Sequence, residues 1–269
     1  MITRIAFAIL CFFAIISHAD AAEGDAPALS AKELAGRLSS MQEGASYVRL
    51  LMEMKDAGGA TKGALQLQIK QRRTSAATDL VYQVLWPKER KGEAVLLHQS
   101  AGGAASGWLF VPPNKPQPLS GSQMNEPLFG SDLSYEDAIE NFFGWESQTL
   151  AGSETVNRVK CLILDSKPGE GEHSSYGRVR SWIDVRRLVP LRVEKYLSSG
   201  RLARRIETAR VANDDKGRPI PANLTIYSGQ SDTRTDLDGS RIRHDVTYSD
   251  HDFTPEAMTE LAAPRASAQ

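Results

Sequence analysis

This sequence has few side chains that could act as catalysts or metal ligands. Their spacing does not match the pattern of a known catalytic or metal site. Beyond the N-terminal segment the histidines are His98, His173, His244 and His251, and no two of them have the helical spacing of metal ligands. His244 and His251 lie near Asp245, Asp250 and Asp252, but acids near a strand end usually form a solvated edge. We therefore expect neither a metal site nor a cofactor.

Candidate nucleophiles also lack the context that catalysis requires. No Gly-x-Ser-x-Gly motif occurs, and Ser106 has the wrong spacing for one. Cys161 lies in an apolar, β-rich run, which favours a small buried side chain over a reactive thiol. Neither a phosphate-binding loop nor a dinucleotide fingerprint is present. The sequence predicts no catalytic residue, so a binding protein is expected rather than an enzyme.

Composition narrows the possible partners. The chain has 269 residues, with 32 Lys and Arg against 33 Asp and Glu, so its formal net charge is -1. A protein that neutralises phosphates needs a basic field, and we therefore expect no nucleic-acid partner. A hydrophobic fraction of 41% and a charged fraction of 24% are typical of a folded globular protein.

The N-terminus has the pattern of an export signal. Arg4 precedes an apolar run from Ile5 to Ile16, and the small residues Ala19 and Ala21 follow at the spacing of a cleavage site. We expect residues 1–21 to be a cleaved signal peptide and the mature protein to be periplasmic. Cys161 would then be the one cysteine left, so no internal disulfide is expected. Residues 22–29 are expected to be a flexible lead, 30–262 a single domain, and 263–269 a flexible tail.

Three short helices are predicted from their start signals. Ser30 and Glu33 have the capping-box spacing before a helix over about Ala31–Ser40, and Ser134 and Asp137 repeat that form. Near the C-terminus, Thr254 followed by a proline predicts a third helix start.

Most of the remaining chain alternates with the period of two that is typical of strands. The candidates are Tyr47–Lys55, Leu65–Ile69, Leu80–Trp86, Ala94–Gln99, Trp108–Val111, Val156–Leu164, Val179–Asp184, Leu191–Leu197, Leu202–Val211, Leu224–Tyr227 and Ile242–Tyr248. Turn residues separate them, as antiparallel hairpins require. The prediction is a mainly β protein with a few α-helices, built on one curved antiparallel sheet. Helices would cover part of its apolar concave face.

Two stretches carry a family resemblance. Gly107–Pro112, followed by Phe129–Asp137, resembles the outer-membrane lipoprotein-sorting (LolA-like) superfamily. It is most similar to the branch with a Gly-Ser-Asp-Phe-Ser-Tyr-Glu-Asp signature, with Leu133 at the place of the Phe. Ser181–Asp184 leading to Val189–Tyr196 is similar to the strand and hairpin pattern of the same family.

The resemblance implies a half-barrel with a helical lid over an apolar concave face. It implies a periplasmic carrier of lipid or lipoprotein acyl chains, with an inner-membrane transporter as a further partner and no catalytic residues. A lipid or lipoprotein sensor that regulates a membrane partner is the alternative, and a hydrolase or polar-ligand binding protein is a third possibility.

Alternation along the strands suggests which residues would line such a cavity. The predicted ligand-binding residues are Leu65, Leu67, Ile69, Tyr82, Val84, Trp86, Trp108 and Phe110, with Phe142, Phe143 and Trp145 on or near the lid. Each of them could equally be an ordinary core position, because a period-two stripe shows burial and not what lies opposite.

Overall fold

The computed structural model describes residues 29–260, apart from the side chain of Ser240. The predicted signal peptide, the predicted tail and nearly all of the predicted lead lie outside the described residues. Within this range no helix is long and apolar enough to span a membrane.

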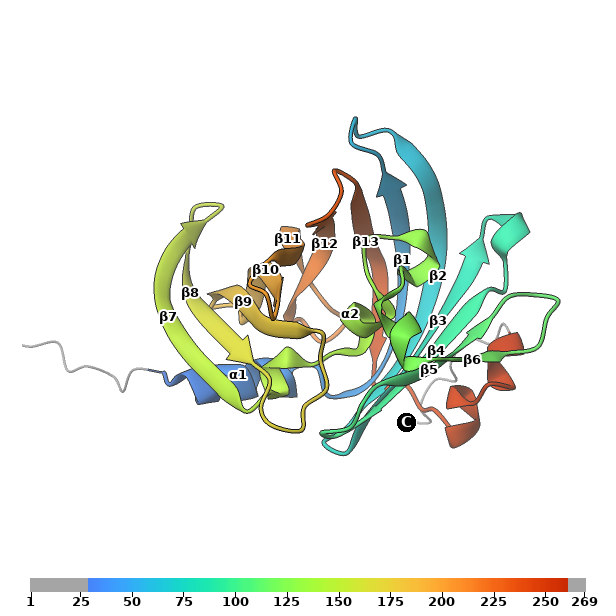
Figure 1. The fold of residues 1–269 in the computed structure, drawn as a ribbon, viewed down its shortest axis with the longest axis horizontal. Coiled ribbons are helices and arrows are strands. Elements are labelled where there is room, and N and C mark those ends of the chain that lie inside the picture. Colours follow the sequence, from blue (N-terminus) through green and yellow to red (C-terminus); the bar gives the residue numbers. More distant parts are fainter. Residues whose placement is uncertain (1–28, 261–269) are drawn as a thin grey trace, which may run out of the picture.

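One open, curved sheet of thirteen antiparallel strands forms the described part of the chain (Figure 1). Its strands are β1 (Gly44–Lys55), β2 (Thr61–Arg73), β3 (Ala77–Trp86), β4 (Ala94–Ser100), β5 (Ser106–Phe110), β6 (Gln117–Leu119), β7 (Ser147–Val156), β8 (Val159–Lys167), β9 (Tyr176–Asp184), β10 (Val189–Leu197), β11 (Leu202–Asn213), β12 (Pro219–Ser228) and β13 (Arg234–His244). The order across the sheet is β6-β5-β4-β3-β2-β1-β13-β12-β11-β10-β9-β8-β7, so that pairing of β1 with β13 joins two meanders. The predicted fold class is confirmed.

Two α-helices and several short 3-10 helices accompany the sheet in the described range. They are α1 (Ala31–Ser40), α2 (Tyr135–Ile139), η1 (Lys88–Arg90), η2 (Gly121–Asn125), η3 (Leu128–Gly130), η4 (Phe142–Gly144), η5 (Asp250–Phe253) and η6 (Ala257–Thr259). Both predicted capping boxes are present, at the start of α1 and of α2. The third helix, predicted to start after Thr254, is instead the single 3-10 turn η6, and the 3-10 turn η5 ends just before Thr254.

Two strand predictions need correction. The run Val156–Leu164 contains a hairpin turn, because Asn157 and Arg158 both have positive φ, of 49° and 65°. Such a two-residue turn usually contains glycine. Because Asn157 and Arg158 stand here instead, the sequence contains no signal of the boundary between β7 and β8. The strand predicted over Ile242–Tyr248 ends at His244, where Asp245 has a φ of 53°.

Strand register divides the side chains between a concave and a convex face. Leu50 is paired with Leu67, which is paired with Val84, and these side chains belong to the largest core cluster. That cluster also contains Met124, Leu128, Phe129, Tyr135 and Ile139, from the chain between β6 and β7. We call this chain, residues 121–145, the inner segment. It lies inside the curve of the sheet (Figure 1).

The convex face is covered near β3 to β5 by the end of the described chain. Met258 is 1% exposed and packs with Val81, Leu96 and Phe110, and Phe253 packs against the same cluster. The Gln83 side chain donates a hydrogen bond to the Met258 carbonyl at 3.0 Å. The helix α1 lies instead on the concave side, at the other end of the sheet, where its apolar face packs on β8 and β9.

Candidate functional site

The inner segment is anchored to the concave face by polar contacts of the signature residues. The Asp132 carboxylate accepts hydrogen bonds from the Thr233 and Thr235 hydroxyls, at 2.6 and 2.8 Å, which ties the segment to β13. Ser131 accepts a hydrogen bond from the Leu133 amide, and Ser134 caps α2. These residues therefore hold the segment in place, and the Ser134 cap is the one that the sequence predicted.

A buried charge cluster fixes α2 to strand β10. The Lys195 ammonium lies 2.8 Å from Asp137 and 3.1 Å from Glu140. The Lys195 side chain is 2% exposed and that of Asp137 is 0% exposed. The Tyr176 hydroxyl donates a hydrogen bond to Asp137 at 2.8 Å, and Arg204 lies 3.4 Å from the same carboxylate.

Electrostatics within this cluster favours the ion pairs. Burial alone would raise the pKa of Asp137, but the charge of Lys195 and hydrogen bonds from Lys195 and Ser134 lower it to about 2. Burial likewise opposes the charged form of Lys195, yet Asp137 and Glu140 raise its pKa above the ordinary value. The pKa of Glu140 is raised by burial, against the pull of Lys195. Removal of any one member would leave a buried charge without its partner.

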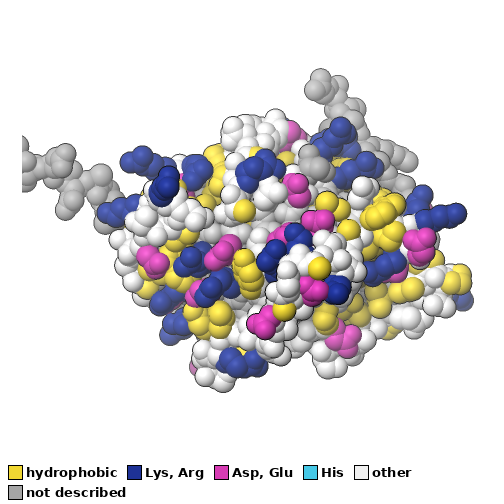
Figure 2. Space-filling view, turned by 90° about the horizontal axis from the view of Figure 1, so that it is seen from above, with side chains coloured by type: hydrophobic (Ala, Val, Ile, Leu, Met, Phe, Trp, Pro, Cys, Tyr) yellow, Lys and Arg dark blue, Asp and Glu magenta, His cyan; other side chains and the backbone are white. Residues whose placement is uncertain are grey.

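The inner segment leaves part of the concave face uncovered, and a cavity of about 910 Å³ lies there. Its size is within the range of small-molecule sites. Apolar wall residues come from the sheet, from α1 and from η4: Val48, Leu50, Leu224, Leu237, Ile242, Leu38 and Phe143. Hydrophobic side chains also gather in several places on the face seen from above in Figure 2, with charged side chains between them.

Polar groups occupy the remaining wall of this cavity. Arg73, Arg210, Arg241 and His244 lie on it, with the carboxylates of Glu43, Glu140 and Asp238. Arg210 lies 3.5 Å from Asp238, and Glu140 is held by Lys195. A smaller, more polar pocket of about 240 Å³ adjoins, and Arg73 lines both spaces.

The eleven predicted ligand residues do not share one wall. Five of them, Leu65, Leu67, Ile69, Tyr82 and Val84, lie on the concave face by register. Leu65, Leu67, Tyr82 and Val84 belong to the cluster covered by the inner segment, so the chain itself fills the space above them. Ile69 is paired with Val48 of the cavity wall. Burial raises the pKa of Tyr82 to about 12.

Three predicted residues lie on the opposite, convex face, which corrects their placement. Trp108 and Phe110 are paired with Leu96 and Ala94, on the face that the C-terminal turns cover. Trp86 is shifted by a β-bulge that pairs it with Gln66, which moves its side chain to the convex face. Trp86 is 51% exposed and Trp108 is 36% exposed. Alternation along a single strand could not reveal either the bulge or the register.

The three predicted lid residues lie together around η4. Phe143 packs with α1 and lines the larger cavity, whereas Trp145 packs with Tyr176 and lines the smaller pocket. Phe142 is partly buried between the two clusters. Sequence reasoning missed Val48 and Leu237, because the pairing of β1 with β13 joins residues about 190 positions apart. It also missed Leu224 on β12 and Arg73 at the end of β2, which line the same cavity.

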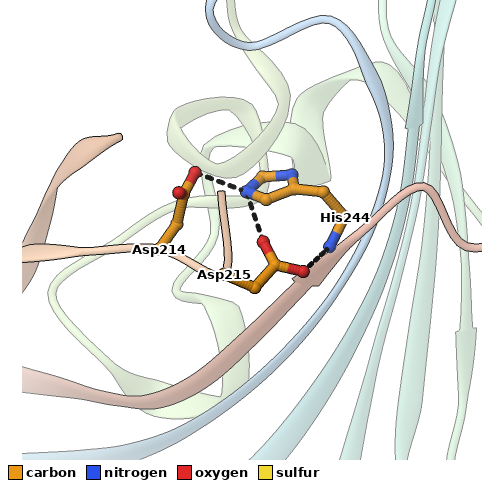
Figure 3. A group of neighbouring side chains, drawn as sticks. All are labelled: Asp214, Asp215 and His244. Atoms are coloured by element: carbon orange, nitrogen blue, oxygen red, sulfur yellow. Dashed lines mark hydrogen bonds and ion pairs between the residues drawn. The ribbon is translucent and has the colours of Figure 1, made fainter. Parts of the chain in front are cut away.

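Three residues of types that often bind metal ions, Asp214, Asp215 and His244, lie close together at the end of β13 (Figure 3). The His244 Nε2 atom lies 2.9 Å from Asp214 and 3.8 Å from Asp215, both in the turn between β11 and β12. Asp214 already accepts hydrogen bonds from the Lys216 and Arg218 amides. Burial would raise the pKa of Asp214, but these bonds and the Arg218 side chain lower it. The Asp214 carboxylate is thus already held by the Arg218 side chain and by two backbone amides of its own turn. His251, the other histidine of this part of the sequence, lies 3.5 Å from Glu260.

Comparison with known proteins gives the chain a family. A family model with the description "Uncharacterized protein" matches residues 77–260, which is more than half of the chain, so the chain belongs to that family. No curated protein matches the chain.

Solved structures share the fold. A DUF1329 family protein from Desulfovibrio piger has a TM-score of 0.78 at 23% identity, over 85% of this chain and 97% of that one. A domain assigned to outer membrane lipoprotein sorting, from Vibrio parahaemolyticus, has 0.76 at 21% identity, over 86% and 98%. A LolA superfamily protein from Nitrosomonas europaea has 0.69 at 18% identity, over 86% and 100%. The expected LolA-like half-barrel is confirmed as a fold, and the signature branch stays a prediction.

Proposed function

We propose that this protein is a periplasmic carrier that binds lipid or lipoprotein acyl chains in the cavity on its concave face. It would receive them from an inner-membrane transporter and deliver them toward the outer membrane. The role is one of binding rather than catalysis. The predicted export signal supports the location, and the fold shared with lipoprotein-sorting and LolA superfamily structures supports the class of ligand.

The observation that carries the proposal is a cavity of about 910 Å³ whose sheet wall includes a group of apolar, only partly buried side chains. Val48, Leu224 and Ile242 contribute to that wall from three strands. Each CH₂ group of an acyl chain that leaves water gains about 0.8 kcal/mol, so such a wall holds a chain without polar chemistry.

A pair of variants on β12 tests the proposal. Leu224 is paired with Leu237 on the concave face, and Tyr227 points to the convex face beside Arg205. We expect Leu224→Asp to weaken binding of the neutral fluorescent probe N-phenylnaphthylamine at least about tenfold, or about 1.4 kcal/mol. Tyr227→Asp is the matched control, because Tyr227 is 37% exposed and outside the cavity wall. Equal binding by both variants and the wild type would remove the cavity as the ligand site.

A further inference from the structure

We propose that the ligand carries an anionic head group, a carboxylate or a phosphate, and that Arg73 binds it. Arg73 is the last residue of β2 and lies on the wall of the cavity. The inference rests on the proposed function, since it assigns the polar end of the ligand whose apolar end the sheet wall would hold.

Arg73 is a buried cation, and no carboxylate among the described residues forms an ion pair with it. It is 7% exposed, and its Nε atom is buried without a hydrogen-bond partner. Its Nη1 and Nη2 atoms donate to neutral oxygens, the Gln42 side chain at 2.9 Å and the Ile139 carbonyl at 3.4 Å. A guanidinium stays charged in proteins, so this group enters the interior as a cation.

Two other cations near this cavity have counter-ions. Lys195, which is even more deeply buried than Arg73, lies against two carboxylates, and Arg210 of the cavity wall lies 3.5 Å from Asp238. The carboxylates that share a pocket wall with Arg73 are engaged or exposed. Glu140 pairs with Lys195, Glu172 accepts a hydrogen bond from the Gly169 amide, and Glu43 is exposed. Buried charges in proteins are normally paired. An anion that is not part of the described chain is therefore the missing partner of Arg73.

The position of Arg73 suits an amphiphile. Arg73 borders both the larger cavity, whose wall includes the apolar side chains of the sheet, and the smaller, more polar pocket of about 240 Å³. That pocket is also lined by the polar side chains of Thr74, Ser100 and Asn141. A ligand with its acyl chain in the larger space would thus reach the guanidinium with its head group. The planar fork of arginine suits carboxylate and phosphate oxygens.

Three ligands of equal chain length test this assignment: dodecanoate, dodecyl phosphate and dodecanol. Each competes with N-phenylnaphthylamine for the wild-type protein, for Arg73→Gln and for the control Arg205→Gln, which alters a paired arginine on the convex face, outside the cavity wall. We expect the wild type and the control to bind at least one of the two anions about tenfold or more tightly than the alcohol. Arg73→Gln should bind all three alike. A preference for the carboxylate over the phosphate would indicate a free fatty acid, and the reverse a phospholipid head group.

The outcomes separate the two proposals. Equal binding of all three ligands by the wild type, or an anion preference that survives Arg73→Gln, would overturn the role of Arg73 and leave the apolar carrier intact. Failure of all three ligands and of the probe to bind would overturn both. If Arg73→Gln does not fold, Arg73→Lys serves instead. It keeps the charge but loses the fork, so the anion preference should shrink while dodecanol binding stays unchanged.

Discussion

Replacement of Lys195 by Met should release the inner segment from the sheet. The substitution keeps an unbranched side chain of nearly the same length and removes the ammonium that lies 2.8 Å from Asp137 and 3.1 Å from Glu140. The two carboxylates are 0% and 5% exposed, so water cannot replace the lost partner. Removal of one member of a buried pair typically costs about 3–5 kcal/mol, and that is the destabilisation we expect.

Urea unfolding at neutral pH measures this cost against a matched control. Arg205→Met removes an ion pair with Glu194 from the neighbouring strand, but the Arg205 side chain is 43% exposed. Exposed pairs contribute about 0–1 kcal/mol, so the control should lose far less stability. A Lys195→Met variant no less stable than Arg205→Met would refute the claim that this cluster holds α2 in place.

Acid provides a second test of the same cluster, with a defined sign. The pKa of Asp137 falls from 3.8 to about 2 on folding, so its contribution is complete above pH 3.8 and is lost as the pH falls toward 2. In Lys195→Met the carboxyls lack their cation, and protonation relieves the unpaired charge. The stability difference between wild type and variant should therefore shrink below about pH 4. A difference that stays constant down to pH 2 would contradict the assigned ionisation.

Three further outcomes follow from the placement of single residues. Trp108→Asp should leave probe binding within about twofold of wild type, because Trp108 lies on the convex face, and a loss beyond tenfold would contradict the register of β5. Met258→Ala should cost about 2–5 kcal/mol in thermal or urea unfolding, because Met258 is 1% exposed in the convex cluster. A loss below about 0.5 kcal/mol would mean that the C-terminal turns do not cover that face. Cys161 is buried and its pKa is raised by burial, so a thiol reagent should label it slowly until urea unfolds the protein. Rapid labelling of the folded protein would contradict its burial.

Local signals in the sequence predicted the local structure well. The Ser30 and Ser134 capping boxes form as expected, because a cap depends on residues three positions apart. Period-two alternation identified most strands and the antiparallel class. Cys161 is buried, as its apolar neighbours indicated.

Features that depend on contacts between distant residues were not predictable. The bulge that turns Trp86 to the convex face is visible only through its pairing with β2. Lysine is a polar residue, and nothing in the local sequence of its strand predicts that Lys195 is buried. Its burial is explained by the ion pair with Asp137, which comes from the inner segment. The cavity arises where β1 meets β13, so its walls combine Val48 with Ile242. Strand register and chain topology, rather than residue type, decide which apolar stripe is free to hold a ligand.

Native mass spectrometry of the protein isolated from its own periplasm, without detergent, tests the central claim most directly. The account predicts a mass increment that corresponds to an acyl-chain lipid or lipoprotein, present in the wild type and in Tyr227→Asp and lost in Leu224→Asp. Protein that is free of any such increment and also fails to take up N-phenylnaphthylamine would contradict it.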